Sequence, residues 1–309
     1  MITTAIVQSA MELGCIYALV ALALFLSFSI LNIADMTTDG CFTLGCAVSA
    51  MMCLSGHPFL GIVMAMIAGV AAGYVTAFLQ THLGVPSILA GIITNTGLYT
   101  INLAVMGFSS NVSLFRQTTI FSIAKDAAKK TAVKGWGELI VAVIIVAIVG
   151  LFLLFFLKTR LGMSIRATGD NPDMVRASSI NPAFTITVGL CIANALTALS
   201  GALLGQYNGS CDINLGTGMV VIGLASLIIG ETLIGRKKMG RWIFGVIIGS
   251  ILYRFIVALA LRANMPAEAM KLISAVIVAV AIAFPSIKKQ ITFHKQRLAL
   301  KKKMEGPRC

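Results

Sequence analysis

Long apolar runs alternate with short polar stretches along most of the chain. A helix that crosses about 30 Å of hydrocarbon needs about 20 apolar residues, and most of the runs approach that length. Nine runs are candidate spans: residues 5–31, 41–54, 58–83, 86–107, 136–157, 183–207, 218–233, 242–261 and 270–284. The pattern predicts an all-α, polytopic membrane helix bundle of about nine transmembrane helices (about eight to ten), in a single domain over residues 1–309.

The amino-acid composition also indicates a membrane protein. The 309 residues are 58% hydrophobic and 11% charged, with a mean hydropathy of +0.94, which leaves too little polar side-chain area to cover a soluble globule. The chain starts without a basic segment or a small-residue cleavage site, so we expect no cleavable signal peptide. The seven cysteines form no CxxC pair, and we expect no metal site.

Lysine and arginine are concentrated in residues 158–176, in residues 236–241 and in the tail at residues 286–309. Short loops rich in these residues stay on the cytoplasmic side. An even number of spans separates each segment from the next, so we predict that all three, including a basic cytoplasmic tail, are inside and the N-terminus outside. The linker at residues 108–135 also carries basic residues and conflicts with this scheme, although longer loops follow the rule less closely. This topology and anionic membrane lipid account for the net charge of +13, and no nucleic-acid partner is expected.

The chain lacks the motifs of several common catalytic sites. It contains no GxxxxGK[ST] phosphate-binding loop, no HExxH and no GxSxG. We therefore predict that it is not an enzyme and that it holds no ATP, magnesium or other cofactor of its own.

A polar interruption at residues 159–182 separates two long runs and is predicted to be a cytoplasmic loop. Asn171 is a favourable N-cap, Pro172 suits the first helical position and Asp173 suits the positive end of a helix dipole. We predict a helix of about two turns that ends before Pro182. So short a helix is marginal in water by itself. It needs a docking surface, which is either a partner protein or the surface of the membrane.

The run at residues 41–54 is too short to cross the hydrocarbon layer, because it spans only about 21 Å at 1.5 Å per residue. One interpretation is that its helix begins inside the membrane, with Asp35, Thr38 and Asp39 beside a polar cavity, as in the broken helices of transporters. The other is an ordinary cytoplasmic turn in which these residues cap the helix.

Polar groups within the apolar runs are further candidates for a translocation path, because exposure to lipid costs a few kcal/mol. Such groups occur at Glu12, Asn95, Asn102, Asn194 and Arg254, and the candidates for the path are Asn95 and Arg254. Asn95 either contacts a solute or links neighbouring helices. Arg254 either meets a solute carboxylate, pairs with Glu12 or Glu231, or has a purely structural role.

Three segments resemble a known family. SIRATGDNPDMVRASSIN (residues 164–181) is similar to the cytoplasmic loop of ABC-importer permeases of the branched-chain amino acid and ribose permease superfamily. LNIADMTTDGCFTLGCAVSA (residues 31–50) resembles the segment after the first helix in the tryptophan/tyrosine-type or uncharacterised branch, and residues 200–231 resemble a later helix pair. Ser179 departs from the family, in which glycine is usual. The resemblance covers most of the chain and implies the fold of a type II importer permease.

In that family the loop contacts the ATP-binding subunit, so the resemblance implies that residues 159–182 form a coupling loop. The residues assigned to this contact are Arg166, Gly169, Asn171, Pro172, Asp173, Met174, Arg176 and Ala177. The resemblance also implies a prokaryotic plasma-membrane importer of a small organic solute, expected to be an amino acid. Its expected partners are an ATP-binding subunit dimer that carries ATP and magnesium, an extracytoplasmic solute-binding protein, and a second permease subunit that makes a homodimer.

Two other classes remain at the level of sequence. An ion-coupled secondary transporter would place ionisable residues near the middle of the membrane, and Glu12, Asp35 and Arg254 could serve in that role. An integral membrane enzyme is the third class, and the sequence shows no recognisable catalytic set for it.

Overall fold

The computed structural model describes residues 4–129, 135–236 and 238–262, together with a few isolated helical positions between residues 272 and 283. The elements in chain order are α1 (Thr4–Leu24), η1 (Phe25–Ile30), α2 (Thr38–Leu54), α3 (Pro58–Thr81), α4 (Ser87–Val105), β1 (Asn111–Ser113), α5 (Ile120–Lys129), α6 (Gly137–Phe156), α7 (Arg160–Asp170), α8 (Pro172–Ala177), α9 (Pro182–Asn208), β2 (Ser210–Asp212), α10 (Met219–Ile234) and α11 (Met239–Arg262).

The all-α membrane fold is confirmed. Six helices of the described part are long and apolar enough to cross a membrane, and α2 and α10 are shorter apolar helices. Together they account for all the predicted spans except the one at residues 270–284. That span lies mostly outside the described residues, and the basic tail at residues 286–309 lies wholly outside them. The number nine therefore stays a prediction.

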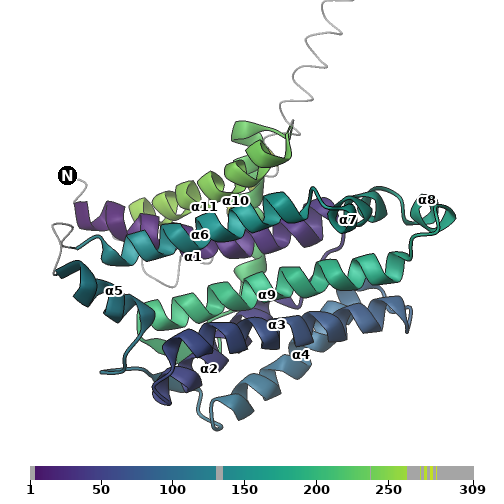
Figure 1. The fold of residues 1–309 in the computed structure, drawn as a ribbon. Helices are drawn as coiled ribbons and strands as arrows, with labels where there is room; N and C mark the ends of the chain where they lie inside the picture. Colours follow the sequence, from purple (N-terminus) through teal and green to yellow (C-terminus); the bar gives the residue numbers. More distant parts are fainter. Residues whose placement is uncertain are drawn as a thin grey trace, which may run out of the picture.

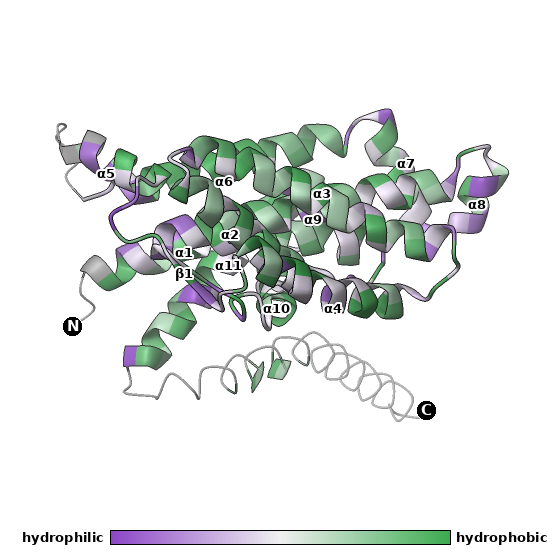
Figure 2. Ribbon diagram, turned by 90° about the horizontal axis from the view of Figure 1, so that it is seen from below, coloured by the Kyte–Doolittle hydropathy of each residue, from purple (hydrophilic) through white to green (hydrophobic). Residues whose placement is uncertain are grey.

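The long helices lie side by side, with α1 and α9 in the interior of the bundle (Figure 1). α1 packs against α6, α9, α10 and α11, and α9 also packs against α2 and α3. Every side chain from Ala18 to Leu26 is buried, whereas α6 exposes Ile148, Leu151 and Phe155. Hydrophobic residues cover the lengths of the helices, and hydrophilic ones gather near the ends, for example on α5 and α8 (Figure 2). This distribution is expected when lipid surrounds the helices along their lengths and water contacts their ends.

Glycines bring α2 and α9 into backbone contact. A Cβ added at Gly201 would lie 1.9 Å from the carbonyl oxygen of Phe42, and one added at Gly45 would lie 2.0 Å from the carbonyl oxygen of Ala198. Neither position has room for a side chain. Small residues of this kind allow membrane helices to pack closely, and here they fix α2 against the middle of α9.

One end of the bundle carries α7 and α8, and the N-terminus lies at the other (Figure 1). The described residues of the basic segment at 236–241 share the end that carries α7. Ser29 in η1 donates a hydrogen bond of 3.0 Å to Glu231 Oε1, the same atom accepts one of 2.9 Å from Trp242 Nε1, and α7 also packs on η1. As predicted, residues 158–176 and the described residues of 236–241 share one side of the bundle.

The N-terminal end carries the linker between α4 and α6. β1 and β2 pair antiparallel there, with Val112 opposite Cys211, and Phe121 in α5 packs edge-on against Tyr207 at 5.5 Å between ring centroids. The sequence patterns did not indicate these strands or α5. Strands of three residues are too short to show an alternating pattern, and α5 buries little beyond Ile120 and Phe121.

Candidate functional site

The polar interruption contains a helix that the sequence did not predict. Thr159 is the N-cap of α7, and its Oγ1 accepts a hydrogen bond of 3.2 Å from Gly162 N. Ile165 is fully buried, and the hydroxyl of Thr168 lies 2.8 Å from that of Thr185 in α9. A Cβ at Gly169 would lie 1.9 Å from the carbonyl oxygen of Ile30. α7 is therefore held firmly on η1 and α9.

α8 follows α7 and is the helix of about two turns that the sequence predicted. Asn171 Oδ1 accepts hydrogen bonds of 3.0 Å from the backbone nitrogens of both Asp173 and Met174. Val175 is the one buried side chain of α8, whereas Met174 is 53% exposed. Ser179 follows with φ of 61°, a left-handed conformation that glycine adopts more easily. This conformation gives a physical reason for the glycine that is usual at this position.

The eight residues assigned to the coupling contact have two different surroundings. All but Gly169 are exposed on α7 and α8: Arg166, Asn171, Pro172, Asp173, Met174, Arg176 and Ala177. Gly169 instead packs against η1. α8, which carries most of the exposed set, projects from the end of the bundle (Figure 2).

α2 begins deep within the bundle, after an irregular segment at residues 32–37 that ends in a turn. Asp35 Oδ2 accepts a hydrogen bond of 2.8 Å from Asn194 Nδ2 in the middle of α9, and Thr37 Oγ1 lies 2.8 Å from Thr76 Oγ1 in α3. Asp35 is 3% exposed and Thr38 is 2% exposed. Asp35 therefore fixes this irregular segment between α3 and α9. The interpretation of a helix that begins inside the bundle fits these contacts, and a peripheral turn does not.

Asp39 caps a helix other than its own. Its Oδ2 accepts a hydrogen bond of 2.9 Å from Gly218 N, and its Oδ1 accepts one of 2.9 Å from Val220 N, at the start of α10. Thr43 Oγ1 accepts another, of 3.1 Å, from Gly216 N. The first turns of α2 and α10 thus meet inside the bundle, joined by one carboxylate. Asp39 does not cap α2 as the second sequence interpretation had it, because both of its oxygens accept from the start of α10. Of the residues considered as caps, Asp35 accepts a hydrogen bond of 2.8 Å through its Oδ1 from Thr37 N, just before α2.

A polar cavity of about 330 Å³ opens at this junction. The lining residues come from α2, from α4 and from the segment before α10: Asp39, Gly40, Thr43, Asn95, Thr96, Tyr99, Asn102, Ile213, Asn214 and Thr217. Of the five residues predicted for a translocation path, the cavity brings together Asp39 and Asn95. Asp35 and Thr38 are buried near the start of α2 and do not line it. Asn102 was noticeable in the sequence as an amide within an apolar run, and Asn214 and Thr217 gave no such signal.

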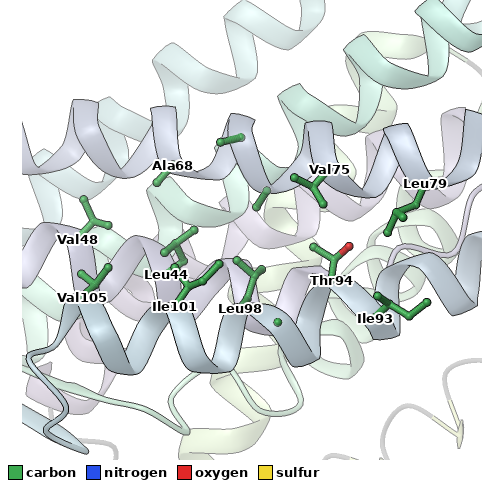
Figure 3. Close-up of a pocket in the computed structure, with 13 residues that line it drawn as sticks. Leu44, Val48, Ala68, Val75, Leu79, Ile93, Thr94, Leu98, Ile101 and Val105 are labelled. Carbon is green, nitrogen blue, oxygen red and sulfur yellow. The ribbon is translucent and has the colours of Figure 1, made fainter. Parts of the chain in front are cut away.

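A larger groove of about 590 Å³ lies between α3 and α4, against α2 (Figure 3). Its lining is almost entirely apolar, and the hydroxyl of Thr94 is already bonded to the carbonyl oxygen of Ala90 at 3.0 Å. Such a lining offers hydrogen bonds to no polar solute. The smaller cavity is therefore the better candidate for a polar solute.

Arg254 lies elsewhere, in a third pocket between α1 and α11. Its guanidinium carbon is 3.5 Å from the centroid of the Tyr17 ring, a cation–π contact. Glu12 bonds instead to Gln8 and Tyr207, and Glu231 bonds to Ser29, Trp242 and Arg236. Arg254 thus pairs with neither of the glutamates considered as partners.

The chain matches the family of branched-chain amino acid transport system permease components over residues 6–282. It belongs to this permease family. Among its relatives, it is 34% identical over 279 residues to a tyrosine transport system permease protein of Clostridioides difficile, covering 89% of this chain and 90% of that one. It is 30% identical over 216 residues to the ribose import permease protein of Escherichia coli, covering 69% of this chain and 61% of that one.

Two solved structures share the fold of this permease. A chain of PsaBC from Streptococcus pneumoniae superposes with a TM-score of 0.52 at 13% identity, covering 89% of each chain. A metal-chelate type ABC transporter in an inward-facing conformation gives a TM-score of 0.50 at 14% identity, covering 92% of this chain and 85% of that one. The predicted resemblance is confirmed: the protein is a multi-pass ABC-importer permease of the branched-chain amino acid and ribose superfamily.

Proposed function

We propose that this permease imports an amino acid and is driven by ATP hydrolysis in separate subunits that dock on α8. An extracytoplasmic binding protein delivers the solute to a permease homodimer. The ATP-binding subunits carry ATP and magnesium and shift the dimer between outward- and inward-open states. The permease itself performs no covalent chemistry.

The geometry of α8 is the observation that carries this proposal. α8 is capped by Asn171, held to the bundle through the buried side chain of Val175, and otherwise exposed. It continues from α7, which packs on both η1 and α9. Force applied to α8 therefore reaches η1, which continues α1, and one end of α9. α1 and α9 are the two most interior helices of the bundle.

The distribution of basic residues supports an orientation of the permease in which α7 and α8 face the cytoplasm. The end with α7 and α8 carries Arg160, Arg166, Arg176, Arg236 and Arg241, as expected for the cytoplasmic side of a prokaryotic plasma membrane. The N-terminus is then outside. The linker with β1 and α5 is also outside, within reach of a binding protein.

The amino-acid assignment draws on the relatives. The relative named for tyrosine transport matches at higher identity and over more of both chains than the ribose import permease does. The polar cavity at the α2–α10 junction fits a small polar solute on the path.

Reconstitution tests the proposal. Proteoliposomes that hold the permease, its ATP-binding subunit and its binding protein should accumulate L-tyrosine only with internal ATP. Uptake by the permease alone, driven by a proton or sodium gradient, would show a secondary transporter instead.

A further inference from the structure

The polar cavity at the α2–α10 junction has hydrogen-bonding groups that nothing in the described part of the chain satisfies. The side chains of Asn95, Tyr99, Asn214 and Thr217 line it, and their amide and hydroxyl groups make no hydrogen bond with other described residues. Asn102 contributes a further free atom, its Oδ1. The cavity therefore offers both donors and acceptors to a guest.

Asn102 is the most informative of these residues. It is 1% exposed, and its Nδ2 donates a hydrogen bond of 3.0 Å to the carbonyl oxygen of Gly40. This bond fixes the orientation of the amide, because the flipped amide would bring two oxygens together. Oδ1 is left buried without a partner. A buried acceptor without a partner is unfavourable, and a donor from a bound solute would satisfy it.

The charge of the cavity limits the class of solute. Asp39 is the only ionisable carboxylate, and no lysine, arginine or histidine is among the lining residues. Both oxygens of Asp39 already accept N–H groups at the start of α10, and α2 also begins beside it. The positive ends of two helices offset much of one negative charge. The cavity thus suits a solute with no net charge rather than a cation or an anion.

We propose that this cavity recognises both charged ends of a zwitterionic α-amino acid as it crosses the membrane. The solute's ammonium group donates to Asn102 Oδ1, on the side of Asp39. Its carboxylate accepts from the amides of Asn95 and Asn214 and from the hydroxyl of Thr217. The volume of about 330 Å³ is at the small end for ligand sites, as expected for a single amino acid. This inference rests on the proposed function.

Equilibrium binding of radiolabelled L-tyrosine tests the site directly. The protein is the purified permease with its ATP-binding subunit, without the binding protein, so that only the permease selects the solute. The competitors are tyramine, which lacks the carboxylate, and tyrosine without its amino group. We expect each competitor to bind about tenfold or more weakly than L-tyrosine, because one set of cavity groups is then left unpaired.

Substitutions locate the recognition in the cavity. Asn102→Leu should weaken L-tyrosine binding about tenfold and abolish the preference for tyrosine over its analogue without the amino group, an effect that a merely structural change would not produce. Tyr99→Phe should weaken binding by about twofold to threefold. Tyr74→Phe is the matched control, because Tyr74 is 54% exposed and Tyr99 is 52% exposed, but Tyr74 lies outside the cavity. It should bind as the unaltered protein does.

Two results would refute recognition by this cavity: equal binding of tyrosine and both analogues, or unchanged binding of L-tyrosine to the Asn102→Leu protein. Either result would leave the proposed function standing, provided that the complete transporter still takes up L-tyrosine. A complete transporter that takes up no L-tyrosine would overturn the proposed function and this inference together. If Asn102→Leu does not assemble, Thr217→Val decides instead, because Thr217 is exposed and has no side-chain bond. That variant must bind L-tyrosine more weakly by at least about twofold.

Discussion

Replacement of Asp39 by alanine tests whether this carboxylate is chiefly a structural cap. In the structure Asp39 accepts two hydrogen bonds of 2.9 Å from Gly218 N and Val220 N. A hydrogen bond to a charged group contributes about 1.5–3 kcal/mol, and loss of a helix cap costs about 0.5–2 kcal/mol. Since both bonds serve the same helix end, we take a total of about 3 kcal/mol for the destabilisation.

Thermal unfolding of the purified permease measures this cost. A destabilisation of about 3 kcal/mol corresponds to a fall in Tm of about 6–12 °C, at about 2–4 °C per kcal/mol in a protein of this size class. Asp39→Asn should recover only part of the loss, because its single amide oxygen can replace only one of the two acceptors. Asp212→Ala is the matched control: Asp212, at the end of β2, also accepts a backbone hydrogen bond, of 2.8 Å from Asn214 N, but this bond is exposed. Its Tm should fall by no more than about 2–3 °C.

A different result would refute this reasoning. If Asp39→Ala kept the Tm of the unaltered protein and lost only L-tyrosine uptake, the carboxylate would be a solute ligand rather than the cap of α10. The account of the α2–α10 junction would then be wrong.

Other substitutions probe helix contacts and α8. Gly201→Ala should prevent assembly of a folded permease, because its Cβ would lie 1.9 Å from the carbonyl oxygen of Phe42, whereas Gly97→Ala, which meets nothing within 4 Å, should behave as unaltered protein in size-exclusion chromatography. Asn171→Ala should lower ATP-driven uptake severalfold, because loss of the cap destabilises α8 by about 1 kcal/mol; unchanged uptake would argue against a role for an ordered α8. Ser179→Gly should raise the stability of the α8 turn by about 1 kcal/mol, since the left-handed conformation costs a non-glycine residue about that much; hydrogen exchange at residues 172–179 would detect slower exchange, and faster exchange would contradict the prediction.

Much of the fold was accessible from sequence because its determinants are local. The spans follow from the lengths of the apolar runs, and the cap of α8 follows from the adjacent residues Asn171, Pro172 and Asp173. α7 was missed because the 160–170 segment is polar, and Ile165 is its one large side chain that is fully buried. That is too weak a pattern to indicate a helix.

The candidate site depends on contacts between distant segments. Asp39 reaches residues 179 and 181 positions further along the chain, so the sequence placed Asp39 near a polar cavity without identifying the helix that it caps. Asn95 and Asn102 were apparent as amides in an apolar run, but their shared cavity depends on how α4 crosses α2. Glu12 and Glu231 were considered as partners of Arg254 because their charges are opposite to its own, whereas the fold places its guanidinium on the Tyr17 ring.

The central claim is that force from a separate ATPase enters this permease through α8. A photo-crosslinking amino acid at Met174, which is 53% exposed on α8, tests it most directly. The matched control position is Phe108, which is 74% exposed and follows α4 at the opposite end of the bundle. The account predicts that, in membranes containing the whole transporter, the probe at Met174 crosslinks to the ATP-binding subunit and the probe at Phe108 does not. Absence of that crosslink at Met174 from a transporter that still imports its solute would contradict the account.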